Sequence, residues 1–259
     1  MKFQILIRFI FLFFCLSMMI VSAKADMDKG IEYYQKRHIN STGFNASKNL
    51  INQAIGHFRN EIQNPEFEKD AALYLLKSYY YKGEFATQEK DEKKKVFNTG
   101  KTLGETYIKK YPNSPAFRYW YLVNLGSWAQ VYGILAAARE GVADLMKIHS
   151  EKIIELDPEF HQGGGYFMLG AVHFKSPYIP FLLPWPNNDK AIKYLKLALD
   201  TGKPTLNQKV YLAQALKRNK QNDLAKRLLF EVINSKPDSI NLVEDLDEIE
   251  EARQLLANF

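Results

Sequence analysis

Two segments of this chain repeat one apolar pattern at a fixed spacing, and this repeat constrains the fold more than any other feature. Each segment begins with a helix-type run in which a leucine precedes a small residue, Gly170 in one copy and Ala213 in the other. The following apolar faces begin at Ala191 and Ala225, which lie 34 residues apart. Small side chains let paired helices approach closely, so the spacing predicts stacked helix-turn-helix units.

Prolines and turn sequences divide the rest of the chain into similar units. Pro204 and Pro237 end the last two units, because a helix interior does not accept proline. We therefore expect an all-α solenoid of antiparallel helix pairs with long insertions between some helices. The expected units span about residues 26–66, 67–112, 113–158, 159–204 and 205–237, followed by a capping helix over residues 238–259.

The capping helix is expected to be amphipathic and acidic. One apolar stripe is formed by Leu242, Leu246, Ile249, Arg253 and Leu256. The acidic residues then form a polar outer face, as the terminal unit of a solenoid requires.

The first 25 residues have the composition of a secretory signal peptide. Lys2 and Arg8 precede an apolar run that ends at residue 21, and Ala25 completes a small-x-small cleavage site. We expect cleavage near Ala25, export to the periplasm and a mature domain of residues 26–259. The run is shorter than a comfortable transmembrane span. An uncleaved anchor that starts at Ile5 is the alternative.

The exported chain would contain no cysteine and little excess charge. Cys15, the only cysteine, lies in the signal and follows two phenylalanines instead of the small residues of a lipoprotein signal. Disulfides and thiol chemistry are therefore not expected in the mature chain. Loss of Lys2, Arg8 and Lys24 lowers the formal net charge from +6 to +3. No nucleic-acid partner is expected at this charge.

No motif of a catalytic, metal or cofactor site occurs in the sequence. The five histidines lack metal-ligand spacing, and no nucleophile motif is present. The run Gly163-Gly164-Gly165 lacks the Lys or Ser/Thr of a phosphate loop, so we interpret it as a structural start of a helix. We expect a protein that is not an enzyme. The basic run Lys93-Lys94-Lys95 could bind an anion, but a solvated helix face is the favoured interpretation.

Two regions carry the candidate residues for binding a ligand or a partner. Aromatic side chains of the helix expected at 116–131 either fill the core or line a concave surface. The Pro-rich loop 175–188 either packs back as a lid, which we favour, or presents an apolar binding surface. His173 lies just before this loop, where a packed core histidine is the favoured interpretation. The candidates are Tyr119, Trp120, Trp128, His173, Tyr178, Phe181 and Trp185.

The repeats over residues 48–237 resemble the tetratricopeptide repeat (TPR) superfamily. The segment 160–170, the Pro-rich loop and Asp189-Lys190-Ala191 look more narrowly like the TatT family, the TPR-like T component of tripartite ATP-independent periplasmic (TRAP) transporters. The run from Tyr119 to Gly126 is also similar to that family. A similar layout occurs in the regulator-of-microtubule-dynamics TPR proteins, against which the cleavable signal argues.

The TatT resemblance implies an exported helical protein that contacts a periplasmic ligand-binding protein and contains a hydrophobic cavity or pore. This sequence differs from the TatT family in lacking a lipoprotein signal, so the resemblance does not imply a membrane anchor here. We expect an interaction protein that assists solute uptake, with a protein partner and an apolar ligand. The alternative is an envelope-assembly scaffold without a small-molecule ligand, and an enzyme with an unusual helical site is the least favoured class.

Overall fold

The structure, a computed structural model, describes residues 24–259. The expected signal peptide, including Cys15, lies outside the described residues except for Lys24 and Ala25. Within residues 24–259 only helices, loops and the isolated bridges Thr42–Asn45 and Ile179–Leu183 occur. The first helix covers residues 24–35. The others are α2 (Lys48–Glu61), α3 (Glu68–Phe85), α4 (Lys90–Lys110), α5 (Pro115–Tyr132), α6 (Ile134–Arg139), α7 (Val142–Leu156), α8 (Phe160–Lys175), α9 (Asn188–Asp200), α10 (Leu206–Arg218), α11 (Asn222–Ile233) and α12 (Leu242–Ala257).

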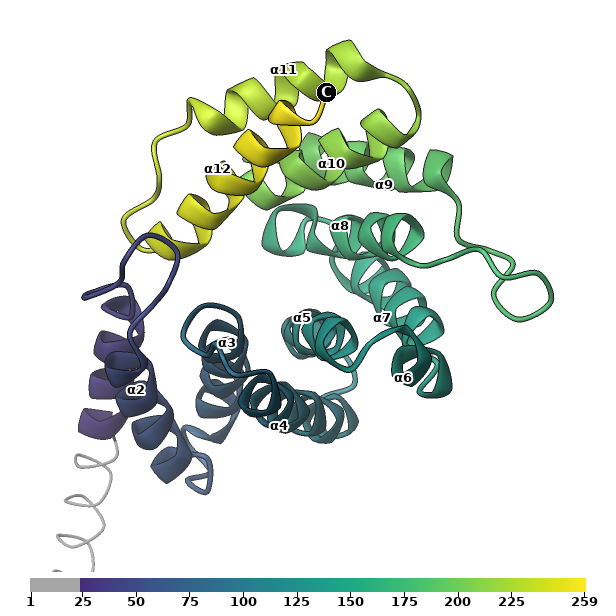
Figure 1. The fold of residues 1–259 in the computed structure, drawn as a ribbon. Coiled ribbons are helices and arrows are strands. Elements are labelled where there is room, and N and C mark those ends of the chain that lie inside the picture. The colour runs from purple at the N-terminus through teal and green to yellow at the C-terminus, as the bar shows by residue number, and fades with distance from the viewer. Residues whose placement is uncertain (1–23) are drawn as a thin grey trace, which may run out of the picture.

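Successive helices pack as antiparallel pairs and follow a curved path, which confirms the all-α solenoid (Figure 1). Helices α3, α5, α8, α10 and α12 lie on the inner side of the curve, and α2, α4, α7, α9 and α11 lie on its outer side. The curve brings the end of the first helix and the loop that follows it to the start of α12. The solenoid therefore forms a ring with an inner surface.

Close packing of α8 against α9 depends on the small residue predicted at position 170. A Cβ atom at Gly170 would lie 2.7 Å from Cγ of Leu195 and 3.0 Å from the Leu195 backbone nitrogen. Leu195 is completely buried. The interhelical distance in this unit is thus set by the absence of a side chain at Gly170.

The glycine run starts α8 with a kink. His161, Gln162 and Gly163 have φ angles of 49°, 56° and 74°, in the left-handed region. A Cβ atom at Gly163 would meet Oγ1 of Thr201 at 2.4 Å, and Nε2 of the buried Gln208 donates to the Gln162 carbonyl at 2.8 Å. The run is a structural helix start, as the sequence indicated, and the kink directs His161 toward α5.

A buried arginine joins the two ends of the solenoid. The Arg37 side chain is 1% exposed, and its Nη2 atom lies 2.6 Å from Oε1 of Glu244 at the start of α12. The same guanidinium donates to Oδ1 of Asn241 and lies over the Tyr34 and Tyr81 rings, with its carbon 4.4 and 4.9 Å from their centroids. Ion pairing, hydrogen bonding and cation–π contact together close the ring.

The buried residues of α12 differ from those of the predicted apolar stripe. Among its five residues only Ile249 is fully buried, whereas the buried apolar side chains of α12 are Val243, Ile249 and Ala252. Val243 packs into the hydrophobic cluster of the first helices, while Ala252 packs against the C-terminal units. The buried face of α12 differs from the predicted one because the helix packs against both the first helices and the last repeats. It closes the ring as well as covering the last repeat.

We predict that Gly170→Leu destabilises the protein by roughly 1–3 kcal/mol or more, because the added side chain forces α8 and α9 apart. Thermal melting of the variant should show the loss. Gly56→Ala is the matched control, since a Cβ atom there meets nothing within 4 Å. An unchanged melting temperature in Gly170→Leu would show that this helix pair is not tightly packed.

We predict that Arg37→Met lowers the free energy of unfolding by about 3–5 kcal/mol, because Glu244 then loses the partner of a buried ion pair. Denaturant unfolding measures the change. Lys36→Met is the control, since Lys36 pairs only with Glu32 on the exposed surface, with the two side chains 53% and 58% exposed. Equal effects of the two substitutions would contradict the proposed role of Arg37.

Candidate functional site

The inner surface of the ring is the candidate site, and α3 contributes its first side chains. Lys77, Tyr80 and Glu84 follow one another at spacings of three and four residues, which place them on one face of a helix. The Lys77 ammonium lies 4.8 Å from the Tyr74 ring centroid and 5.8 Å from the Trp120 ring centroid. Burial lowers the pKa of Lys77, and the positive charge of Arg37 lowers it further. The amine therefore faces aromatic rings in a partly dry environment.

Aromatic rings connect α3 to α5 and α8. The ring centroids of Tyr80 and Trp120 are 6.2 Å apart, and those of Trp120 and His161 are 5.9 Å apart. Tyr119 lies 4.5 Å from the His161 ring, centroid to centroid. Burial lowers the pKa of His161, and the Lys77 charge adds to this effect. The imidazole is therefore neutral at pH 7 and extends the aromatic surface.

Helix α10 continues the inner surface through Tyr211. Its ring packs edge-on against Phe167, with a centroid distance of 5.2 Å, and the Lys175 ammonium lies 4.9 Å from its centroid. Gln214, one turn further along α10, donates to Oε1 of Glu251 on α12 at 2.7 Å. This hydrogen bond joins the aromatic part of the surface to the acidic helix.

Helix α12 carries a group of carboxylates whose pKa values are raised by burial and by one another's negative charges. Burial raises the pKa of Glu248 to about 8; the Asn207 amide donates to this carboxylate, while Glu251, Asp247 and Asp245 oppose its ionisation. Burial also raises the pKa of Asp247 to about 6, with a contribution from Glu84 on α3. Glu248 therefore carries a proton for most of the time at pH 7.

Burial and the same carboxylates also raise the pKa of tyrosines on α3 and α10. Burial raises the pKa of Tyr80 well above its ordinary value, and the charges of Glu84 and Glu248 raise it further. Burial raises the pKa of Tyr211 too, followed by the charges of Glu248 and Glu251. A polar pocket of about 200 Å³ lies between the end of α3, the start of α4 and α12, with Glu84, Lys93 and Asp247 among its lining residues.

Two of the seven sequence-predicted residues lie together on this surface, and they are Tyr119 and Trp120. Tyr119 is largely buried beneath His161, whereas Trp120 is half-buried beside Tyr80 and Lys77. Trp128, two turns along α5, is buried and stacks on Tyr132 with a centroid distance of 4.4 Å. It belongs to the core and is not part of the inner surface.

The Pro-rich loop divides into a packed part and an exposed tip. His173 is only 4% exposed and stacks on Tyr194, and Trp185 packs edge-on against it. Trp185 also donates from Nε1 to Oδ1 of Asp144 at 2.8 Å. The predicted packing of the loop as a lid is thus confirmed only around Trp185. The prediction that His173 is a packed core histidine is confirmed. The tip is not packed, because the Tyr178 side chain is 62% exposed and that of Phe181 is fully exposed.

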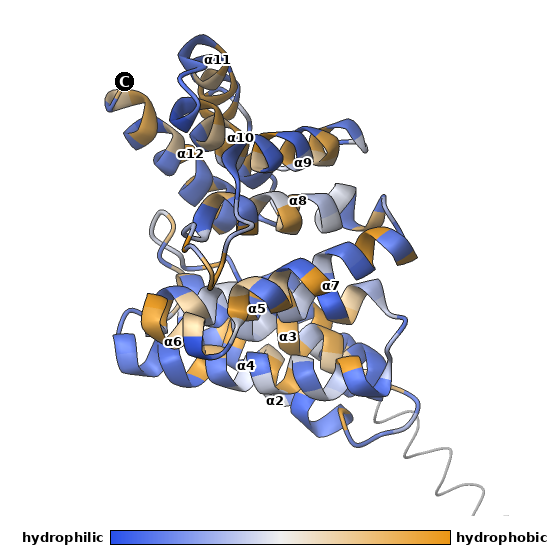
Figure 2. Ribbon diagram, turned by 90° about the vertical axis from the view of Figure 1, so that its right-hand side faces the viewer, coloured by the Kyte–Doolittle hydropathy of each residue, from blue (hydrophilic) through white to orange (hydrophobic). Residues whose placement is uncertain are grey.

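The short helix α6 was not expected from the sequence. It interrupts the long connection between α5 and α7 and exposes Ile134 and Leu135 to solvent, at 61% and 75%. Figure 2 shows the apolar residues of α6 in orange, below the loop between α8 and α9. These exposed side chains lie on a different face from the inner surface.

Sequence reasoning missed most of the inner side chains, which are Lys77, Tyr80, Glu84, His161, Tyr211 and Glu248. The spacing of Lys77, Tyr80 and Glu84 was visible in the sequence as one polar face of an otherwise apolar helix. For Glu248 no such signal existed, since the acidic face of α12 could not be distinguished from a solvated face. Within residues 24–259, no cluster suited to a metal ion is found, and no helix is long and apolar enough to cross a membrane.

Comparison with solved structures shows the fold. The chain is similar to the crystal structure of a thermophilic TPR protein from Thermus thermophilus, with a TM-score of 0.59 and 14% sequence identity. The match covers 91% of this chain and 97% of that one. No protein-family model and no curated protein matches the sequence. The fold is therefore that of a TPR-like helical repeat protein.

We predict that the free energy of unfolding decreases as pH rises from about 5 to 8. The unfolded chain releases the Glu248 proton near the ordinary glutamate pKa of 4.5, whereas the folded chain keeps it up to about pH 8. One such proton contributes at most about 1.4 kcal/mol per pH unit. Glu248→Gln should flatten this slope in denaturant titrations at several pH values.

Glu250→Gln is the control for this titration, because Glu250 lies on the same helix and pairs with Arg253 at 3.4 Å. This variant should keep the pH dependence of the parent. A slope that is unchanged in Glu248→Gln would show that Glu248 is not protonated in the folded chain.

Proposed function

We propose that this chain is an exported TPR-type interaction protein that binds a segment of a partner protein on its inner surface. One observation carries the proposal: aromatic contacts and charge effects connect side chains of α3, α5, α8, α10 and α12, the helices on the inner side of the curve. Curved solenoids use such concave surfaces to bind extended partners. Side chains from several repeats can then contact one continuous segment.

The chemistry of the inner surface suggests what the partner segment contains. Tyr80, Trp120 and Tyr211 offer aromatic faces that suit apolar or cationic side chains. Glu84, one turn from Tyr80 on α3, and Glu251 on α12 would accept hydrogen bonds from Lys or Arg. A segment that combines apolar and basic residues fits both parts.

The arrangement of the first helix supports export with cleavage near Ala25. Met27 is buried in the N-terminal cluster, and Oδ1 of Asp26 lies 2.8 Å from Nδ1 of His57. Lys24 and Ala25 are exposed. A mature chain that begins at Asp26 would therefore retain these contacts of its first helix. We propose the periplasm as its location.

The TatT resemblance suggests a more specific role as an accessory of periplasmic solute uptake, with a periplasmic binding protein as the partner and an apolar ligand. The apolar loop tip at Tyr178 and Phe181 would be available for such a partner. Two pockets within residues 24–259 are lined largely by polar side chains. This observation favours the second candidate, an envelope-assembly scaffold that binds no apolar ligand.

Site-specific photo-crosslinking in the cell that produces the protein tests the inner surface. A benzophenone amino acid replaces Tyr80 or Trp120 in turn, and the same substitution at the outer residues Ile148 and Phe230, which are 57% and 51% exposed, is the control. We expect a discrete protein adduct from the inner positions and little or none from the outer ones. Intact-mass analysis of the same samples should give a chain that starts at Asp26.

Adducts from the outer positions alone, or from all four positions equally, would contradict binding on the inner surface. The identity of the adduct separates the two candidate roles. A periplasmic binding protein favours the uptake accessory, and an envelope-assembly component favours the scaffold.

A further inference from the structure

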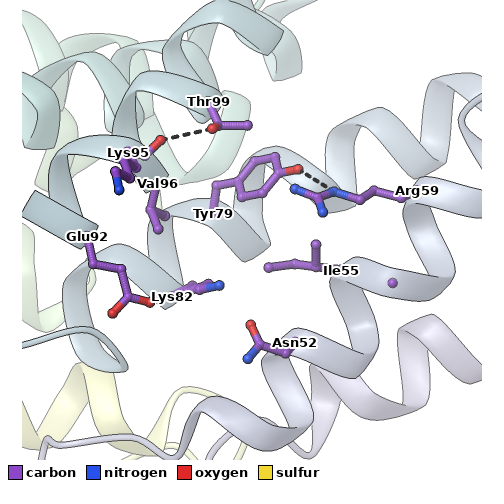
Figure 3. Close-up of a pocket in the computed structure, with 10 residues that line it drawn as sticks. Asn52, Ile55, Arg59, Tyr79, Lys82, Glu92, Lys95, Val96 and Thr99 are labelled. Atoms are coloured by element: carbon purple, nitrogen blue, oxygen red, sulfur yellow. Dashed lines mark hydrogen bonds between the residues drawn. The ribbon is translucent and has the colours of Figure 1, made fainter.

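A second concave site lies outside the ring, between the outer helices α2 and α4. Figure 3 shows this groove, whose floor is formed by α3, and its volume is about 430 Å³. This volume falls within the range of pockets that bind small molecules. The lining residues are Asn52, Ile55, Gly56, Arg59, Tyr79, Lys82, Glu92, Lys95, Val96 and Thr99.

Positive charge in the groove exceeds negative charge. Arg59, Lys82 and Lys95 line it, and within residues 24–259 none of the three has a carboxylate within 4.0 Å. The one acidic lining residue, Glu92, forms an ion pair with Lys48 at 2.5 Å. Three cations and one carboxylate leave the lining with a formal charge of +2.

Lys82 occupies the middle of the groove, as Figure 3 shows, and it is only partly exposed. Burial lowers its pKa; among the neighbouring charges Glu92 opposes this shift most strongly, and Lys48 and Arg59 add to it. The Lys82 ammonium thus has cationic neighbours and, within residues 24–259, no carboxylate within 4.0 Å. A bound anion would supply the missing counter-charge.

Three lining residues of the groove are buried and give it an apolar part. Ile55, Tyr79 and Val96 belong to the hydrophobic core and are at most 8% exposed. Nε of Arg59 donates to the Tyr79 hydroxyl at 3.0 Å, which orients the guanidinium along the groove. Space for a ligand remains at Gly56, where an added Cβ atom would meet nothing within 4 Å.

We propose that this groove binds a small organic dianion, a phosphate monoester or a dicarboxylate, through Arg59, Lys82 and Lys95. The ligand charge matches the excess charge of the lining, and its carbon skeleton would pack against Ile55 and Val96. This interpretation also assigns a role to Lys95, the last residue of the basic run in the sequence. The groove is lined by α2, α4 and the side of α3 that carries Tyr79 and Lys82, so it is a site separate from the inner surface.

Isothermal titration calorimetry on the full exported chain tests the proposal with glycerol 3-phosphate and succinate as probes. We expect one saturable site for at least one of them, weaker binding at higher salt, and no binding of glycerol. Binding of only one probe identifies the anionic group, and binding of both shows recognition by charge.

Two substitutions locate the binding site. Lys82→Gln and Gly56→Glu should each weaken binding at least tenfold, through loss of a cation and addition of a carboxylate respectively. Gly56→Ala is the control for position 56 and should bind as the parent does, and thermal melting verifies the fold of each variant. Absence of a saturable site for both probes, or binding that is unchanged in Lys82→Gln and Gly56→Glu, would overturn the proposal.

Discussion

The architecture depends on a guanidinium that is buried near one end of the chain. Arg37 retains its charge at any accessible pH, so its burial is tolerated only with a counter-charge and with acceptors for its donors. Glu244 and Asn241 provide these from the other end of the chain. This requirement fixes the start of α12 against the first repeat. A stack of helix pairs with two free ends thereby becomes a ring.

Ring closure also determines the character of the inner surface. Because α12 is held at Glu244, its next turns carry Asp247, Glu248 and Glu251 along the inner side, opposite Glu84 and Tyr80. These carboxylates lose part of their hydration, and the pKa of Glu248 rises to about 8. One side of the inner surface is thus acidic, while Trp120 and His161 make the other side aromatic. The same closure leaves the outer groove between α2 and α4 unaffected.

The repeat architecture was predictable because it depends on local and periodic features. A small residue at Gly170 and the 34-residue spacing of Ala191 and Ala225 determine helix pairing within neighbouring segments, and prolines mark where helices cannot continue. His173 as a packed residue and the irregular loop 175–188 followed from the same reasoning.

Features that depend on distant segments were not predictable in this way. Arg37 and Glu244 are 207 positions apart, and nothing local indicates that they meet. The buried face of α12 was therefore assigned only partly to the right residues, since Ile249 is buried and Leu256 packs on the core but Val243 and Ala252 were missed, and its acidic side was interpreted as a solvated cap. Only Tyr119 and Trp120 among the predicted binding residues lie at the inner surface. Periodicity identifies an aromatic helix but not which turn faces inward.

The central claim is that the solenoid is a closed ring held by Arg37. Double electron–electron resonance tests it directly, because a chain of residues 26–259 contains no cysteine and accepts spin labels only where cysteines are introduced. Labels at Ile39→Cys and Ile240→Cys, both exposed positions beside the junction, report the separation of the two ends. The account predicts one narrow, short distance that becomes broad and longer when Arg37→Met is added. A broad, long distribution in the otherwise unchanged chain would show an open solenoid and contradict the account.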